Sequence, residues 1–147
     1  MNTLPWIGRL GLGALFTFSG FEKLIQPAAN FAFVVQSYQV VPAGLEKPIA
    51  QIFPWVEFLA GVFLLAGLYT PIATATLWLL NTSFIGIVGQ ALIRKLPIEN
   101  CGCFGEGIHL PLWAVFALDI ALWAAFLGLW KARKQTGRRG LDALYAR

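Results

Sequence analysis

Long apolar runs separated by short polar stretches make up most of this chain of 147 residues. A helix that crosses a bilayer needs about 20 consecutive, mostly apolar residues. Four segments meet this requirement, at residues 4–21, 48–69, 72–93 and 110–130. Between the second and third, Tyr69-Thr70-Pro71 predicts a tight turn, because proline disfavours helix at the residue before it. The pattern predicts an all-α integral membrane protein, a four-helix bundle in a single domain.

The stretch between the first two spans has a pattern of its own. Its apolar residues follow the i, i+3, i+4, i+7 spacing of one helix face: Phe31, Val34, Val35 and Tyr38. Pro27 and Pro42 bracket this stretch. We expect a short amphipathic helix in the first outer loop, which lies on the membrane surface or caps the bundle. An irregular loop is the alternative.

Composition excludes an ordinary soluble domain. The chain is 58% hydrophobic and 12% charged, whereas charged side chains normally cover the surface of a soluble domain. The net charge of +4 does not indicate nucleic-acid binding, because the basic residues cluster directly after the last apolar segment. These are Lys131, Arg133, Lys134, Arg138 and Arg139.

The basic residues also predict an orientation, because cytoplasmic loops carry an excess of lysine and arginine. The basic tail, residues 131–147, places both termini in the cytoplasm of a multi-pass protein of the bacterial inner membrane. The loops at residues 22–47 and 94–109 then face the periplasm. The sequence leaves a homo-oligomer open.

Small residues recur four apart in the fourth span, at Ala117, Ala121 and Ala125. Residues of this size at this spacing let helices approach closely in lipid. We therefore expect the fourth span to pack tightly against a neighbouring helix.

Both cysteines of the chain lie in one pentapeptide, Cys101-Gly102-Cys103-Phe104-Gly105, in the second outer loop. In an oxidising compartment such a pair forms a disulfide, and a bridge across one residue should be strained. Strained, exposed disulfides serve exchange rather than stabilisation. We favour a redox-active pair over a structural turn or a soft-metal site. Two thiolates and one histidine do not complete a zinc shell, so no complete metal site is predicted within the chain, and one would need a partner or a dimer.

Three residues on the same side of the membrane are candidates to tune these thiols. His109, the single histidine, lies in the same loop, and Lys23 ends the first span next to Glu22. Nearby positive charge favours the reactive thiolate form of a cysteine, and Lys23 and His109 would supply it.

Three charged residues lie inside the predicted spans, namely Arg9, Glu57 and Asp119. A charge that faces lipid is costly, so we expect all three to face the interior and pair there as one polar cluster. This cluster is either a proton path or polar pocket under the cysteine loop, or a clasp that orients the helices. Polar residues of the third span could complete it: Asn81, Thr82, Ser83 and Gln90.

Four motifs resemble the MauE branch of the DoxX-like membrane proteins. They are Arg9, Ser19-Gly20-Phe21-Glu22-Lys23-Leu24, Pro54-Trp55-Val56-Glu57, and the cysteine pentapeptide, which is the most specific. The resemblance covers approximately residues 8–130. It implies a four-helix membrane bundle, a role in the maturation of periplasmic methylamine dehydrogenase, and a thioredoxin-like periplasmic partner.

These observations lead to the hypothesis of a membrane thiol-disulfide redox protein whose Cys101 and Cys103 exchange with that partner. Electrons would pass to or from a quinone in the bundle, although no quinone motif is visible. Two alternatives stay open, namely a non-enzymatic membrane scaffold for assembly and a soft-metal carrier.

Overall fold

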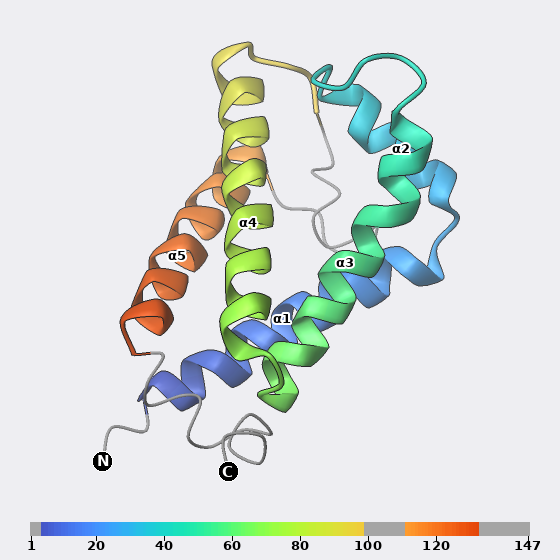
Figure 1. Cartoon of the computed structure of the whole chain (residues 1–147). Coiled ribbons are helices and arrows are strands. Elements are labelled where there is room, and N and C mark those ends of the chain that lie inside the picture. The colour runs from blue at the N-terminus through green and yellow to red at the C-terminus, as the bar shows by residue number, and fades with distance from the viewer. Residues whose placement is uncertain (1–3, 99–110, 133–147) are drawn as a thin grey trace.

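The computed structural model of the chain describes residues 4–98 and 111–132. All regular structure in these residues is helical, and it forms five helices (Figure 1). They are α1 (Leu4–Ile25), α2 (Ala28–Ser37), α3 (Glu46–Ala66), α4 (Thr70–Ile93) and α5 (Leu112–Lys131). The predicted all-α class is confirmed for this part of the chain.

The predicted four-helix bundle is not confirmed. Three helices, α3, α4 and α5, are long and apolar enough to cross a membrane. Helix α1 has a similar length, 22 residues, but it contains Arg9, Glu22 and Lys23. Figure 1 shows α4 and α5 running alongside each other, while α1 crosses them at a steep angle. The difference arises because α1 packs mainly along α3, which is itself inclined to α4. The apolar helices indicate a bilayer environment.

The short helix predicted in the first loop is confirmed as α2. It begins directly after Pro27, and no residue within it is fully buried. The adjacent Tyr38 is buried, and its carbonyl accepts a hydrogen bond from Gln90 Nε2 at 2.8 Å. The ring of Phe31 packs against Phe53 of α3, with centroids 6.0 Å apart. Helix α2 is therefore a cap that packs mainly against α3.

The turn between α3 and α4 comes earlier than the predicted residues 69–71. Gly67 follows the end of α3 in a left-handed conformation, with a φ of 67°. The N–H of Leu68 then bonds the carbonyl of Phe63 at 2.9 Å, a common way for glycine to close a helix. Pro71 lies in the first turn of α4, where its missing N–H needs no partner.

Two apolar clusters hold the helices together. The larger one joins α1, α3, α4 and α5, and in it the rings of Phe16 and Phe126 lie 5.6 Å apart. The smaller one surrounds Tyr38 and includes Val88 and Val115. Helix α4 contributes its first half to the larger cluster and its second half to the smaller one.

The alanine stripe of the last span points away from the other helices. Ala117, Ala121 and Ala125 are exposed. The buried residues of α5 are instead Val115, Asp119, Phe126 and Leu129. The fourth span does pack against a neighbouring helix, α4, as expected, but it does so through these larger side chains and Asp119 and not through the alanine stripe.

The end of α4 carries a lysine where glycine is usual. Lys95 has a φ of 51°, while the N–H of Leu96 closes the helix by bonding the carbonyl of Ala91 at 3.1 Å. A side chain in this left-handed conformation costs about 1 kcal/mol. We therefore expect Lys95→Gly to raise the free energy of unfolding by about 1 kcal/mol, measured by thermal unfolding in detergent micelles.

The matched control for this prediction is Arg94→Gly. Arg94 has a φ of −78°, which any residue adopts, so glycine there gains nothing and loses backbone entropy. A Lys95→Gly variant that melts no higher than the wild type would contradict the expected strain.

Candidate functional site

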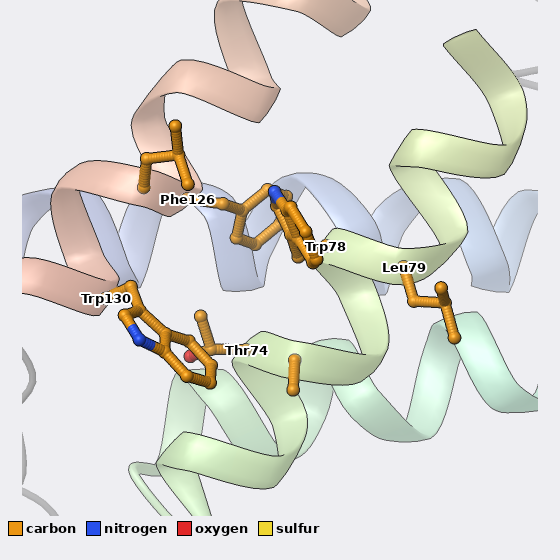
Figure 2. Close-up of a pocket in the computed structure, with 7 residues that line it drawn as sticks. Thr74, Trp78, Leu79, Phe126 and Trp130 are labelled. Atoms are coloured by element: carbon orange, nitrogen blue, oxygen red, sulfur yellow. The ribbon is translucent and has the colours of Figure 1, made fainter. Parts of the chain in front are cut away.

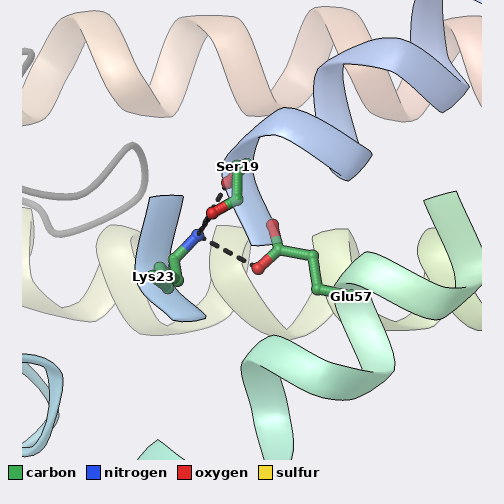
Figure 3. Close-up of polar contacts among 3 residues, drawn as sticks. All are labelled: Ser19, Lys23 and Glu57. Atoms are coloured by element: carbon green, nitrogen blue, oxygen red, sulfur yellow. Dashed lines mark hydrogen bonds and ion pairs between the residues drawn. The ribbon is translucent and has the colours of Figure 1, made fainter. Parts of the chain in front are cut away.

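A lysine–glutamate ion pair joins α1 to α3 in the interior of the protein. Lys23 Nζ lies 3.0 Å from Glu57 Oε2, and the two side chains are 1% and 3% exposed. The same ammonium donates to Ser19 Oγ at 2.6 Å and to the Ser19 carbonyl at 3.4 Å (Figure 3). Three oxygens thus meet the three N–H donors of the ammonium group. The two charges balance each other at a site away from solvent.

The spacing of buried residues explains why this pair forms. On α1 they recur every three or four positions and so share one face: Arg9, Leu12, Gly13, Phe16, Ser19, Gly20 and Lys23. The buried face of α3 consists of Ala50, Pro54, Glu57, Ala60, Gly61 and Leu64. These two faces meet each other, which brings the lysine of one helix to the glutamate of the other.

Glycines allow the two helices to approach closely beside the pair. A Cβ on Gly20 would lie 2.6 Å from the backbone nitrogen of Phe58, and a Cβ on Gly61 would lie 2.6 Å from that of Thr17. Real Cβ atoms essentially never come so near to other atoms. The ion pair is therefore part of a tight helix–helix contact that depends on residues without a side chain.

An aromatic ring of α2 lies over the same ion pair. Lys23 Nζ is 5.9 Å from the centroid of Phe31, within the range of a cation–π contact. Phe31 packs on Phe53, which meets Phe84 of α4 edge-on at 5.3 Å. This row of rings links the ion pair to α2, α3 and α4.

A second buried polar contact joins α4 to α5. Asn81 Nδ2 donates to Asp119 Oδ1 at 3.2 Å, and both residues are buried. Asn81 therefore does bond one of the predicted intramembrane charges. Thr82 and Ser83 are exposed and donate to carbonyls of their own helix, and Gln90 bonds the end of α2.

Arg9, Glu57 and Asp119 are all buried, but Glu57 has Lys23 as its charge partner. Arg9 lies about 21 Å before Lys23 along α1, too far away to reach Glu57. The lysine was missed as a partner because the first span was predicted to end at residue 21. Helix α1 continues to Ile25, so Lys23 lies inside the contact between helices. A joint role for Arg9 and Asp119 stays a prediction.

The family described as methylamine utilisation protein MauE matches residues 1–131. The chain belongs to the MauE family. The predicted MauE resemblance is confirmed, and membership implies a role in methylamine utilisation. No match to the chain is found among curated proteins or solved structures.

The cysteine pair of this MauE-family chain lies outside the described residues. The same is true of His109, so the roles of Cys101, Cys103 and His109 stay predictions from the sequence. Of the other tuning candidates, Glu22 is half-buried. Lys23 is engaged with Ser19 and Glu57, so it could act on a thiol only if the ion pair opened.

The described ends of the cysteine-bearing segment lie in one apolar cluster. Ile98, before the segment, and Leu112, after it, both pack against the cluster that contains Tyr38. The chain therefore leaves and re-enters the described structure beside the end of α2. Within residues 4–98 and 111–132, no group of three His, Cys, Asp or Glu side chains could hold a metal ion.

An apolar groove of about 410 Å³ lies between α4 and α5. Figure 2 shows the indoles of Trp78 and Trp130 on its two sides, with Thr74 between them. The Thr74 hydroxyl donates to the carbonyl of Thr70 at 2.7 Å, so the groove is mainly an apolar surface. Thr74 lies about 28 Å along α4 from Ile93, at the opposite end of the helix from the one that leads to Ile98.

Proposed function

We propose that the protein is a membrane thiol-disulfide redox protein of the MauE family in which Cys101 and Cys103 cycle between dithiol and disulfide. In each exchange the dithiol gives two electrons and two protons to the disulfide of a thioredoxin-like periplasmic protein, or takes them back in the reverse direction. The proteins served would be periplasmic proteins that need disulfides, with methylamine dehydrogenase among them.

The observation that carries this proposal is the anchoring of the cysteine-bearing segment at both ends. Ile98 and Leu112 pack into the same cluster as Tyr38, where α2 caps the helices. In the predicted orientation, with both termini in the cytoplasm of a bacterium, this end of the molecule faces the periplasm. Because both flanks of the segment are attached at this end of the protein, we expect its two cysteines to meet a soluble periplasmic partner there.

Buried charges support a function beyond simple anchoring in the membrane. Ionisable groups within membrane helices are costly and often mark proton pathways. We assign the protons of the exchange to the Lys23–Glu57 pair together with Arg9 and Asp119. His109 and Glu22 remain the residues proposed to tune the thiols.

A quinone is the electron donor or acceptor in this proposal. The groove between Trp78 and Trp130 does not support a quinone that contacts the cysteines, because it lies at the opposite end of α4. The ring would have to bind near the end of α2 instead. Purified protein whose thiols do not change redox state on addition of a quinone would remove this part of the proposal.

In intact cells, a bulky, membrane-impermeant maleimide should label Cys101 and Cys103 only after mild reduction. This result is expected because the pair would rest as a disulfide on the periplasmic side. The variant with Ser at both positions is the control, since it contains no other cysteine and gives the background.

Two other outcomes of this experiment would count against the proposal. Equal labelling without reduction means that the pair rests as free thiols, which rejects a resting disulfide and leaves a reductant, a metal carrier or a docking role. Labelling only in lysed cells means that the topology is inverted, and the periplasmic partner is then rejected.

A further inference from the structure

An apolar cavity of about 140 Å³ lies between α2, α3 and α4. Its wall includes Phe31, Val34, Val41, Phe53, Phe84 and Ile87. A cavity of roughly this volume with an apolar lining has room for a group the size of benzene. Another wall residue, Val40, is 47% exposed, so the cavity reaches the surface of the protein.

Two cations stand at the end of α4, and both Arg94 and Lys95 are exposed. Arg94 Nη2 donates to Gln39 Oε1 at 2.8 Å, and its Nη1 donates to Gln90 Oε1 at 3.2 Å. Both partners are neutral amides. Among residues 4–98 and 111–132, no carboxylate lies within ion-pair distance of Arg94. The guanidinium group is thus held in position by two neutral amides, and no carboxylate of the described residues neutralises its charge.

The backbone at this place carries side chains where glycine would be less strained. Gln39 has a φ of 52° and Lys95 a φ of 51°, both in the left-handed region. This conformation disfavours any residue with a Cβ. A side chain that occurs there despite the strain is a reason to look for a function of that side chain. Both side chains belong to the cationic site. Gln39 is the amide that bonds Arg94, and Lys95 is the second cation.

The cavity and the cations belong to one surface. Gln39, which holds Arg94, lies between Tyr38 and Val40, and both of these line the cavity. On α4, Ile87 lines the cavity and Arg94 follows about 10 Å further along the helix axis. A molecule that is apolar at one end and anionic at the other would satisfy both parts at once.

We propose that this surface binds an anionic phospholipid, with part of an acyl chain in the cavity and the phosphate at Arg94 and Lys95. The acyl chain gains contacts with the apolar wall of the cavity. The phosphate gains two cations, one of them already oriented as a planar donor group that matches phosphate geometry. This proposal does not depend on thiol exchange, because it uses neither cysteine.

The test uses the full chain, purified in a mild detergent, freed of lipid and titrated in native mass spectrometry. The two probes are phosphatidylglycerol and phosphatidylcholine with the same acyl chains. We expect phosphatidylglycerol to bind at least about tenfold more tightly, and Arg94→Gln and Lys95→Gly each to weaken it about fivefold. Lys131→Gln, an exposed cation at the far end of α5, is the control and should change nothing.

Two variants separate binding from folding. Lys95→Gly relieves strain, so its loss of phosphatidylglycerol should accompany a higher melting temperature, which unfolding would not explain. Val41→Phe should fill the cavity and weaken both lipids alike. Equal binding of the two lipids, or wild-type affinity in both Arg94→Gln and Lys95→Gly, would overturn the proposal. Wild-type binding by folded Val41→Phe would overturn the placement of the chain in the cavity.

Discussion

Replacing Glu57 by glutamine is expected to lower the free energy of unfolding by about 3–5 kcal/mol. The variant has nearly the same shape as the wild type, but it leaves the Lys23 ammonium buried without a counter-charge. The lysine side chain is 1% exposed, so water cannot take over the role of the carboxylate. Denaturant or thermal unfolding in detergent micelles measures the loss.

A double variant distinguishes the destabilisation by an unpaired buried charge from the contribution of the ion pair to the free energy of unfolding. Lys23→Met with Glu57→Gln removes both charges, and we expect it to recover most of the stability lost in the single variant, because a buried ion pair often adds little over apolar residues. Glu46→Gln, on the same helix but only half-buried, is the matched control and should stay within about 0.5 kcal/mol of the wild type. A Glu57→Gln variant as stable as this control would mean that Lys23 is not buried as described.

Alanine at Gly20 or Gly61 is expected to cost about 2–3 kcal/mol. Each new Cβ would lie 2.6 Å from a backbone nitrogen of the facing helix. Backbone atoms cannot turn aside as the tip of a flexible side chain can, so α1 and α3 would have to separate. Lys23 would then move away from Glu57, which adds to the loss. The unfolding measurement used for the ion pair also detects this change.

The same substitution at two other helical glycines provides the control. Gly11 and Gly86 have no atom within 4 Å of an added Cβ. Alanine there should be neutral or stabilise the helix by up to about 1 kcal/mol. If Gly20→Ala and Gly61→Ala behave like Gly11→Ala and Gly86→Ala, the close contact of α1 with α3 is not present in the membrane.

Much of the fold could be predicted because helix formation depends on neighbours in the sequence. The apolar runs gave the approximate positions of α1, α3, α4 and α5, and the i, i+3, i+4 spacing of Phe31, Val34 and Val35 gave α2. The predicted helix boundary was wrong where a second local sequence signal determined the end of a helix. Gly67 ended α3 before Tyr69-Thr70-Pro71 was reached, since a left-handed glycine closes a helix and a proline in the first turn does not.

The candidate site was harder to predict from the sequence. Arg9, Glu57 and Asp119 were expected to face the interior of the protein, and all three are buried. The side chains that these three residues contact depend on which faces of two helices meet. The hydropathy of the sequence does not specify those faces. Lys23 was placed at the end of the first span because the apolar stretch stops at Glu22 and Lys23. Helix α1 continues through these two charges to Ile25, and Glu57 of α3 neutralises Lys23.

The sequence by itself determined that the chain is helical, that apolar helices of membrane-spanning length occur, and that the chain carries the motifs of the MauE family. These properties depend on composition and on residues within a few positions of one another. The tertiary structure alone decided that Lys23 meets Glu57, 34 residues away, and that the alanines of α5 face outward. The physical reason is that both results depend on the rotation and separation of packed helices. Those are set by the sizes of all the side chains and glycines at the contact together.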